Sequence, residues 1–260
     1  MTSAVRLKTV GDHRLPALVL VHGWGHCAAV WQPLVELLED HFCIHLLDLP
    51  GYADHQSDDQ SGTQSWQLQS LLASFYRLPI EPAIWCGWSL GGMLATLYAE
   101  RYPDRVSNLV TIASNGVFTQ RHDWPNAMPT ADFTAFQQAL ADNSKSTLSR
   151  FLSLVCQGAD SARTDCRYLK SCLGGASSNT LMLSLDLLNR LDTRSAISRL
   201  TMPQLHIFGA QDALVPVAAS EALAGLNPAG DIEIIADAGH ALLLSHREKI
   251  AENLKRRVSN

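Results

Sequence analysis

The sequence predicts an α/β fold, a doubly wound and mostly parallel sheet into which a helical segment is inserted. Short apolar runs alternate with amphipathic segments, which is the pattern of strands and helices in a parallel sheet. The alternation stops between residues 118 and 189. A serine also stands between two glycines where one apolar run meets a helical pattern. The first two observations predict the fold, and the third raises the question of whether the serine is a nucleophile or part of a structural turn.

The expected strands are apolar at nearly every position, as in strands that are buried on both faces. They are the runs 17–21, 42–47, 83–86, 109–113, 204–208 and 232–236. The expected helices have apolar residues at three- and four-residue spacing. They cover 30–40, 65–76, 90–102, 217–226 and 247–258.

The middle of the chain is helical in type and lacks a buried-strand run. Strand signals resume only at 204–208. The sequence therefore predicts a helical cap at 118–189, inserted into a core formed by 1–117 and 190–260.

Composition and charge exclude several classes of protein. A net charge of −5 argues against general nucleic-acid binding. No apolar run approaches the roughly 20 residues of a membrane-spanning helix, and the N-terminus lacks a signal-peptide core. Six scattered cysteines form no C-x-x-C pair, so we expect reduced thiols and no metal site. We expect a cytoplasmic monomer.

The stretch from Gly87 to Gly91, GWSLG, fits the pattern G-x-S-x-G between an expected strand and an expected helix. At such a turn the residues two before and two after the serine must be small, and the serine takes a strained conformation that projects its hydroxyl. We expect Ser89 to be a nucleophile. The alternative is a plain structural turn.

A nucleophilic serine needs a base, and the base needs an orienting carboxylate, in the chain order Ser, Asp, His. His240 follows the last expected strand, and Asp212 follows the strand at 204–208. Asp237 competes with Asp212, but it belongs to the histidine's own loop. We prefer Asp212 because a carboxylate from a neighbouring loop can approach the far nitrogen of the imidazole ring.

Acyl chemistry also needs backbone N–H donors for the developing oxyanion. Leu90, directly after the serine, is one expected donor. Trp24, in the loop that follows the first expected strand, is the other. We expect His22 in the same loop to brace it without taking a proton.

Together these motifs resemble the α/β-hydrolase family over about residues 16–255, through HGWG, GWSLGG, GAQDALVP and AGHALLLSH. Ala53 departs from the family, which often has glycine in its D-x-P-G-x-G loop. The cap stretches FTQRHDWPNAMPTADFTAFQQALADN and RFLSLVCQGADSARTDCRYLK are similar to those of the esterases of biotin synthesis. This resemblance implies hydrolysis of the methyl ester of a pimeloyl chain on acyl carrier protein, by Ser89, His240 and Asp212 and without a cofactor.

Charge in the cap supports such a partner. Residues 145–170 contain five basic and two acidic residues, a net +3 that leaves −8 for the rest of the chain. Arg163, Arg167 and Lys170 would share a helix face. With Arg150, they are candidates for docking an acidic carrier protein. The alternative is an ordinary solvated face.

Five apolar cap residues either line an acyl channel or simply pack the cap: Phe133, Phe136, Phe151, Leu152 and Leu154. Of these, we name Phe151 as a substrate contact.

Two rival functions would keep Ser89, Asp212 and His240: a short-chain carboxylesterase and a carbon–carbon bond hydrolase. A third rival is a ligand-binding module that keeps the fold without turnover.

Overall fold

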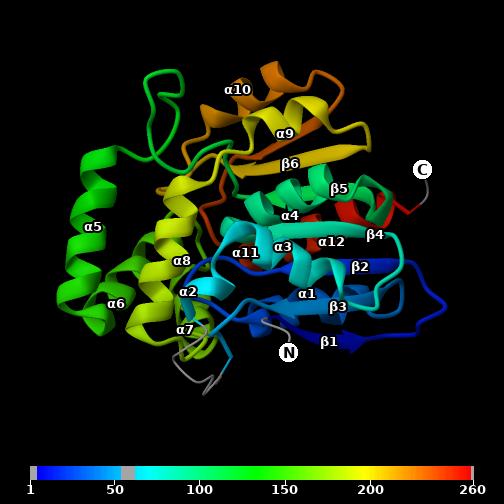
Figure 1. Ribbon diagram of the computed structural model, residues 1–260, viewed down its shortest axis with the longest axis horizontal. Helices are drawn as coiled ribbons and strands as arrows, with labels where there is room; N and C mark the ends of the chain where they lie inside the picture. Colours follow the sequence, from blue (N-terminus) through cyan, green and yellow to red (C-terminus); the bar gives the residue numbers. More distant parts are fainter. Residues whose placement is uncertain (1–4, 54–61, 259–260) are drawn as a thin grey trace.

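The computed structural model describes residues 5–53 and 62–258. Its centre is a sheet in the order β1-β3-β2-β4-β5-β6-β7, in which only the β1–β3 pair is antiparallel (Figure 1). The strands are β1 (Arg6–Val10), β2 (Ala17–Val21), β3 (Cys43–Asp48), β4 (Ala83–Trp88), β5 (Val106–Ile112), β6 (Gln204–Gly209) and β7 (Asp231–Ile235).

All six expected strands are present, and the predicted doubly wound α/β fold is confirmed. The strand β1 is not predicted from the sequence, because its residues are exposed or half-buried. An edge strand with polar residues on both faces carries no buried-strand pattern, so its pairing with β3 cannot be recognised from hydrophobicity.

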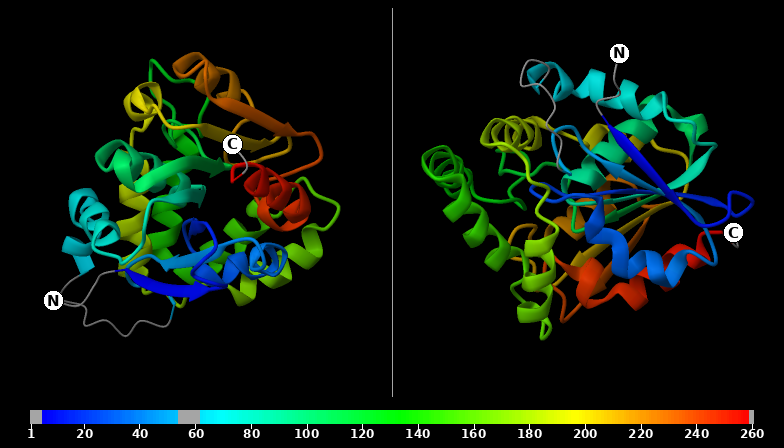
Figure 2. Two further views of the ribbon diagram at one scale, coloured as in Figure 1. Left: turned by 90° about the vertical axis from the view of Figure 1, so that its right-hand side faces the viewer. Right: turned by 90° about the horizontal axis from the view of Figure 1, so that it is seen from below.

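Helices cover both faces of the sheet. On one face α1 (Gln32–Leu38) packs against α12 (Arg247–Arg256), and α3 (Leu68–Tyr76) packs against α4 (Leu90–Arg101) on the other (Figure 2). The expected helix at 217–226 is α10 (Ala219–Leu226), which contacts β7 and α9 (Arg194–Arg199). Two short helices, α2 (Gly62–Ser65) and α11 (Leu242–Ser245), complete the set around the sheet.

Four helices follow β5 and lie beside the end of the sheet where the parallel strands finish (Figure 1). They are α5 (Thr130–Asp142), α6 (Ser144–Val155), α7 (Ala162–Ser171) and α8 (Ser178–Arg190). The first three lie wholly within the cap predicted at 118–189, and α8 ends one residue beyond it. The boundaries of the cap stay a prediction. No helix in the described part of the chain is long and apolar enough to cross a membrane.

The strand order places a crevice at the middle of the sheet. The chain runs from β2 outward to β3 on one side, then returns to β4 and continues outward to β5 on the other. Loops that follow β2 and β4 therefore diverge, and open α/β sheets bind ligands at such a point. Trp24 follows β2 and Ser89 follows β4, so two of the predicted site residues flank this crevice.

The turn at Ala53 forms although the family's usual glycine is missing. Ala53 has φ of +62°, in the left-handed region that disfavours residues with a Cβ atom. Ala53 therefore adopts the left-handed conformation of this turn with some backbone strain.

Candidate active site

Ser89 occupies the junction between β4 and α4. Its φ is +53°, which is strained for a serine. Two hydrogen bonds from the β5 side hold this conformation: the Ser89 N–H donates to the Ile112 carbonyl at 2.9 Å, and Ser114 Oγ donates to the Ser89 carbonyl at 2.9 Å. The backbone is thus fixed by its surroundings and the side chain is left free.

The glycines on both sides of the serine are required by close backbone approach. A Cβ atom on Gly87 would lie 2.3 Å from the carbonyl carbon of Gly91, and one on Gly91 would lie 2.2 Å from the Val21 carbonyl oxygen. Neither contact is possible for a real side chain. The G-x-S-x-G spacing therefore reflects how tightly α4 packs against the ends of β4 and β2.

The structure brings Asp212 and His240 together from the loops after β6 and β7. His240 Nδ1 lies 2.8 Å from Asp212 Oδ2, and both side chains are only 1% exposed. The backbone N–H groups of Leu214 and Val215 donate to Asp212 Oδ1 at 2.8 and 2.9 Å. The carboxylate is thus oriented by its own loop and directs its second oxygen at the imidazole.

Asp237, the competing carboxylate, is engaged elsewhere. Its Oδ1 lies 3.1 Å from His246 Nε2, and its side chain is 83% exposed. The geometry therefore pairs His240 with Asp212.

Trp88 connects the serine elbow to the histidine loop. Its indole Nε1 donates to the His240 carbonyl at 2.9 Å, and its ring packs against the His240 ring with centroids 5.5 Å apart. Among the described residues, Ser89 Oγ makes no hydrogen bond, so the hydroxyl is available to a substrate. The hydrogen bond between a nucleophilic serine and its histidine base is often long in ligand-free enzymes and shortens when substrate binds.

Both expected oxyanion donors are backbone groups without an acceptor in the described part of the chain. Leu90 is the first residue of α4, so its N–H has no intrahelical partner. The Trp24 N–H is likewise unused, whereas the next N–H, that of Gly25, donates to Tyr52 Oη at 3.3 Å. The Trp24 indole is anchored on α8, where Nε1 donates to the Leu181 carbonyl at 3.0 Å.

His22 holds the Trp24 loop in place. Its Nδ1 donates to the Gly23 carbonyl at 2.8 Å, and its Nε2 accepts from the Leu49 N–H at 3.0 Å. Complete burial lowers the pKa of His22, which keeps the ring neutral. The ring therefore braces the loop, as expected from the sequence.

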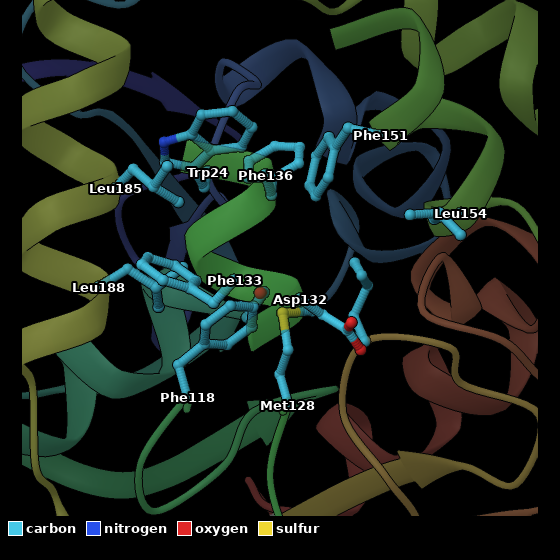
Figure 3. A pocket seen from close by; sticks show the side chains of 12 residues that line it. Trp24, Phe118, Met128, Asp132, Phe133, Phe136, Phe151, Leu154, Leu185 and Leu188 are labelled. Atoms are coloured by element: carbon cyan, nitrogen blue, oxygen red, sulfur yellow. The ribbon is translucent and has the colours of Figure 1, made fainter. Parts of the chain in front are cut away.

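An apolar pocket of about 570 Å³, including its opening to solvent, extends from Ser89 between core and cap (Figure 3). Four of the five apolar cap residues considered for an acyl channel line it, and Leu152 is buried in the main apolar core instead. The full lining is Trp24, Ser89, Phe118, Met128, Asp132, Phe133, Phe136, Phe151, Leu154, Leu185, Leu188 and Leu214.

The candidate docking residues are all exposed: Arg150 lies on α6, and Arg163, Arg167 and Lys170 lie on α7. Asp165 on α7 is instead buried and accepts a hydrogen bond from Ser161 Oγ at 2.6 Å. The outward face of α7 therefore carries positive charge without the compensating carboxylate that its sequence suggests.

His26 is a buried site residue that sequence reasoning missed. Its Nδ1 donates to the Trp24 carbonyl at 2.9 Å, and its ring packs against Trp88 with centroids 5.1 Å apart. Its Nε2 has no partner among the described residues. Burial lowers the pKa of His26 to about 3, so the ring stays neutral at physiological pH.

This burial predicts a pH dependence of stability. Below the unfolded-state pKa of about 6.5, His26 is protonated in the unfolded chain but stays neutral in the folded protein. The free energy of unfolding therefore falls as the pH falls from about 6.5 toward 3. Between pH 7 and 5 this loss is about 2 kcal/mol. Between pH 7 and 5, the free energy of unfolding of His26→Leu, measured in urea, should fall by about 2 kcal/mol less than that of wild type. His41→Leu, at an exposed histidine, should keep the pH dependence of the wild-type free energy of unfolding. An equal fall in all three proteins would show that His26 is not the source of the pH dependence.

Comparisons with known proteins match most of the chain. A profile of the family described as alpha/beta hydrolase fold matches residues 16–247. A protein from Salmonella paratyphi A named pimeloyl-acyl-carrier protein methyl ester esterase is 40% identical over 232 residues, 88% of each chain. A protein of the same name from Xanthomonas oryzae pv. oryzae is 38% identical over 248 residues, 94% of this chain and 96% of that one.

Among solved structures, an esterase from Exiguobacterium antarcticum has a TM-score of 0.87 at 21% identity and covers 98% of this chain and 96% of its own. At that identity the likeness concerns the fold alone.

Proposed function

Since the chain belongs to the α/β-hydrolase family, we propose that it is a serine carboxylesterase that hydrolyses the methyl ester of a pimeloyl chain on acyl carrier protein. The products are the free acid, still attached to the carrier, and methanol. The observation that carries the proposal is the apolar pocket that Ser89 lines, in a chain 38–40% identical to esterases named for this substrate. The mostly apolar side chains that line the pocket suit an alkyl acyl chain.

In the proposed mechanism Ser89 Oγ attacks the ester carbonyl while His240 Nε2 takes the hydroxyl proton. The negative charge that develops on the carbonyl oxygen is stabilised by the N–H groups of Leu90 and Trp24. His240 then gives its proton to the departing methoxide, which leaves as methanol. A water molecule repeats the attack on the acyl-enzyme, and Ser89 recovers its proton as the acid is released.

Asp212 acts on the imidazole. Its Oδ2 accepts a hydrogen bond from His240 Nδ1–H at 2.8 Å, which fixes the tautomer that leaves Nε2 free to act as base. The negative charge then stabilises the imidazolium formed in each half of the reaction. Because the two loop N–H donors hold the other carboxylate oxygen, little reorganisation is needed when this charge develops.

The aromatic side chains of the pocket supply the proposed acyl site. Trp24 packs edge-on against Phe136 and Phe151, with centroids 5.5 and 4.9 Å apart. Trp24 thus carries a proposed oxyanion donor on its backbone and an acyl contact on its side chain. A bound chain that contacts these rings would sit with its ester close to both oxyanion donors, and this proximity favours reaction.

We propose that the acidic carrier docks on Arg150, Arg163 and Arg167. Changing Arg163 and Arg167 together to Glu should lower kcat/KM for a carrier-bound methyl ester by roughly tenfold, because steering toward an acidic partner is lost. The kcat/KM for p-nitrophenyl acetate should not change. Raising the salt concentration should reduce the difference in kcat/KM for the carrier-bound ester between wild type and variant, because salt screens the charges. An unaltered rate on the carrier-bound ester would overturn the docking face.

A comparison of substrates separates the main proposal from its rivals. We expect kcat/KM for the carrier-bound methyl ester to exceed that for short p-nitrophenyl esters. The opposite order would favour a short-chain carboxylesterase. Cleavage of a diketone with neither ester turned over would favour a carbon–carbon bond hydrolase.

We further propose that the enzyme works as a cytoplasmic monomer, without nucleic-acid or membrane partners. Its net charge of −5 does not favour nucleic acid. Its large exposed apolar side chains come from separate segments of the described chain and do not suggest one extensive self-association surface. They are Tyr76, Leu154, Ile234 and Val258.

A further inference from the structure

The pocket contains one charged side chain, Asp132, in the first turn of α5. Ser89 is the other lining residue with a hydroxyl or carboxyl group, and it already has a proposed role. Among the described residues, the Asp132 carboxylate makes no hydrogen bond or ion pair, and no basic side chain lines the pocket. The negative charge of Asp132 is therefore not neutralised by any side chain that lines the pocket.

Exposure locates Asp132 at the entrance. Of the twelve lining residues, only Asp132 and Leu154 are exposed, so these two mark where the pocket opens to solvent. In Figure 3 both lie on the opposite side of the pocket from Leu185 and Leu188 of α8. Leu154 is one helical turn beyond Arg150 on α6, so the entrance adjoins the proposed docking face.

The far end of a bound dicarboxylic acyl chain would lie near the Asp132 carboxylate. When one ester end of a dicarboxylic chain is at Ser89, its other end points along the pocket toward the entrance. A carrier-bound chain presents an uncharged thioester there. A free monomethyl ester presents its second carboxylate there, and this carboxylate and Asp132 are like charges that repel each other at the mouth of the apolar pocket.

We propose that Asp132 is a specificity residue that rejects acyl chains with a free carboxylate at the far end and so favours carrier-bound or otherwise neutral chains. This inference rests on the proposed esterase function and adds the class of substrate that the same site excludes. Like charges placed opposite each other are a general means of rejecting wrong partners. An alternative role for Asp132 is favourable interaction with the N-terminal end of the α5 dipole, which would affect stability without affecting substrate choice.

The test compares monomethyl and dimethyl pimelate as substrates of the full-length enzyme. We expect wild type to prefer the dimethyl ester. Asp132→Asn should raise kcat/KM for the monomethyl ester by roughly fivefold and leave that for the dimethyl ester within about twofold. Asp132→Lys should raise the monomethyl rate further. Asp142→Asn, which removes the same charge from the far end of α5, is the matched control and should resemble wild type.

Equal effects of Asp132→Asn on the two esters, or an equal shift in Asp142→Asn, would overturn the role of Asp132 while leaving the esterase proposal intact. Failure of wild type to hydrolyse the dimethyl ester, while the carrier-bound methyl ester is still cleaved, would overturn this inference alone. Failure on both esters would overturn the esterase proposal, and this inference with it. A change in thermal stability without a change in the ratio of the two rates would assign Asp132 to the helix dipole alone.

Discussion

Replacing Ser89 with alanine should lower kcat for ester hydrolysis by roughly 10⁴- to 10⁶-fold, since removing the nucleophile disables the whole catalytic unit. The fold should survive, because the Ser89 backbone bonds to Ile112 and Ser114 do not involve the hydroxyl. The measurement is the rate of p-nitrophenyl acetate hydrolysis by purified wild type and variant, with circular dichroism as a check on folding.

Covalent labelling distinguishes nucleophile loss from a general disturbance. A fluorophosphonate should label wild type at Ser89 and leave Ser89→Ala unlabelled. Ser153→Ala, which removes an exposed hydroxyl from α6, is the matched control and should keep wild-type labelling and rate. Labelling of wild type at a different serine, or an active Ser89→Ala enzyme, would contradict the role of this residue.

Asp212→Asn should lower kcat by roughly 10⁴-fold with a small effect on the structure. The amide is nearly the same size as the carboxylate, and its oxygen can still accept the two loop N–H bonds. Its NH₂ group would then face His240 Nδ1, which stabilises the tautomer with the proton on Nε2 and removes the base. The loss of negative charge also leaves the imidazolium unstabilised.

Asp237→Asn provides the matched control, because the same substitution is made in the carboxylate that contacts His246. We expect its kcat to stay within about twofold of wild type, as for most exposed substitutions. A larger loss in Asp237→Asn than in Asp212→Asn would show that the wrong carboxylate has been assigned.

The core of the fold was predictable because burial on both faces forces nearly continuous apolar runs, which are easily read as strands. The segment that became β1 has no such run, since its register is set by pairing with β3 and not by burial. Ala53 shows a similar limit: the chain adopts a left-handed turn there without the glycine that would announce it.

Ser89, Asp212 and His240 could be proposed from sequence because each stands in a loop directly after a strand, and parallel strands end at one edge of a sheet. His26 and Asp132 could not. The importance of His26 depends on its burial against Trp88, and that of Asp132 on how α5 is placed over the core. Both follow from packing between segments far apart in the chain, for which a single sequence gives no signal.

The most direct test of the central claim is methanol release from pimeloyl-carrier-protein methyl ester, measured with wild type and Ser89→Ala in parallel. We predict rapid release by wild type, with the acid left on the carrier, and no release above background by the variant. Absence of methanol in the wild-type reaction, while p-nitrophenyl acetate is still hydrolysed, would keep the serine hydrolase and contradict the carrier-bound substrate.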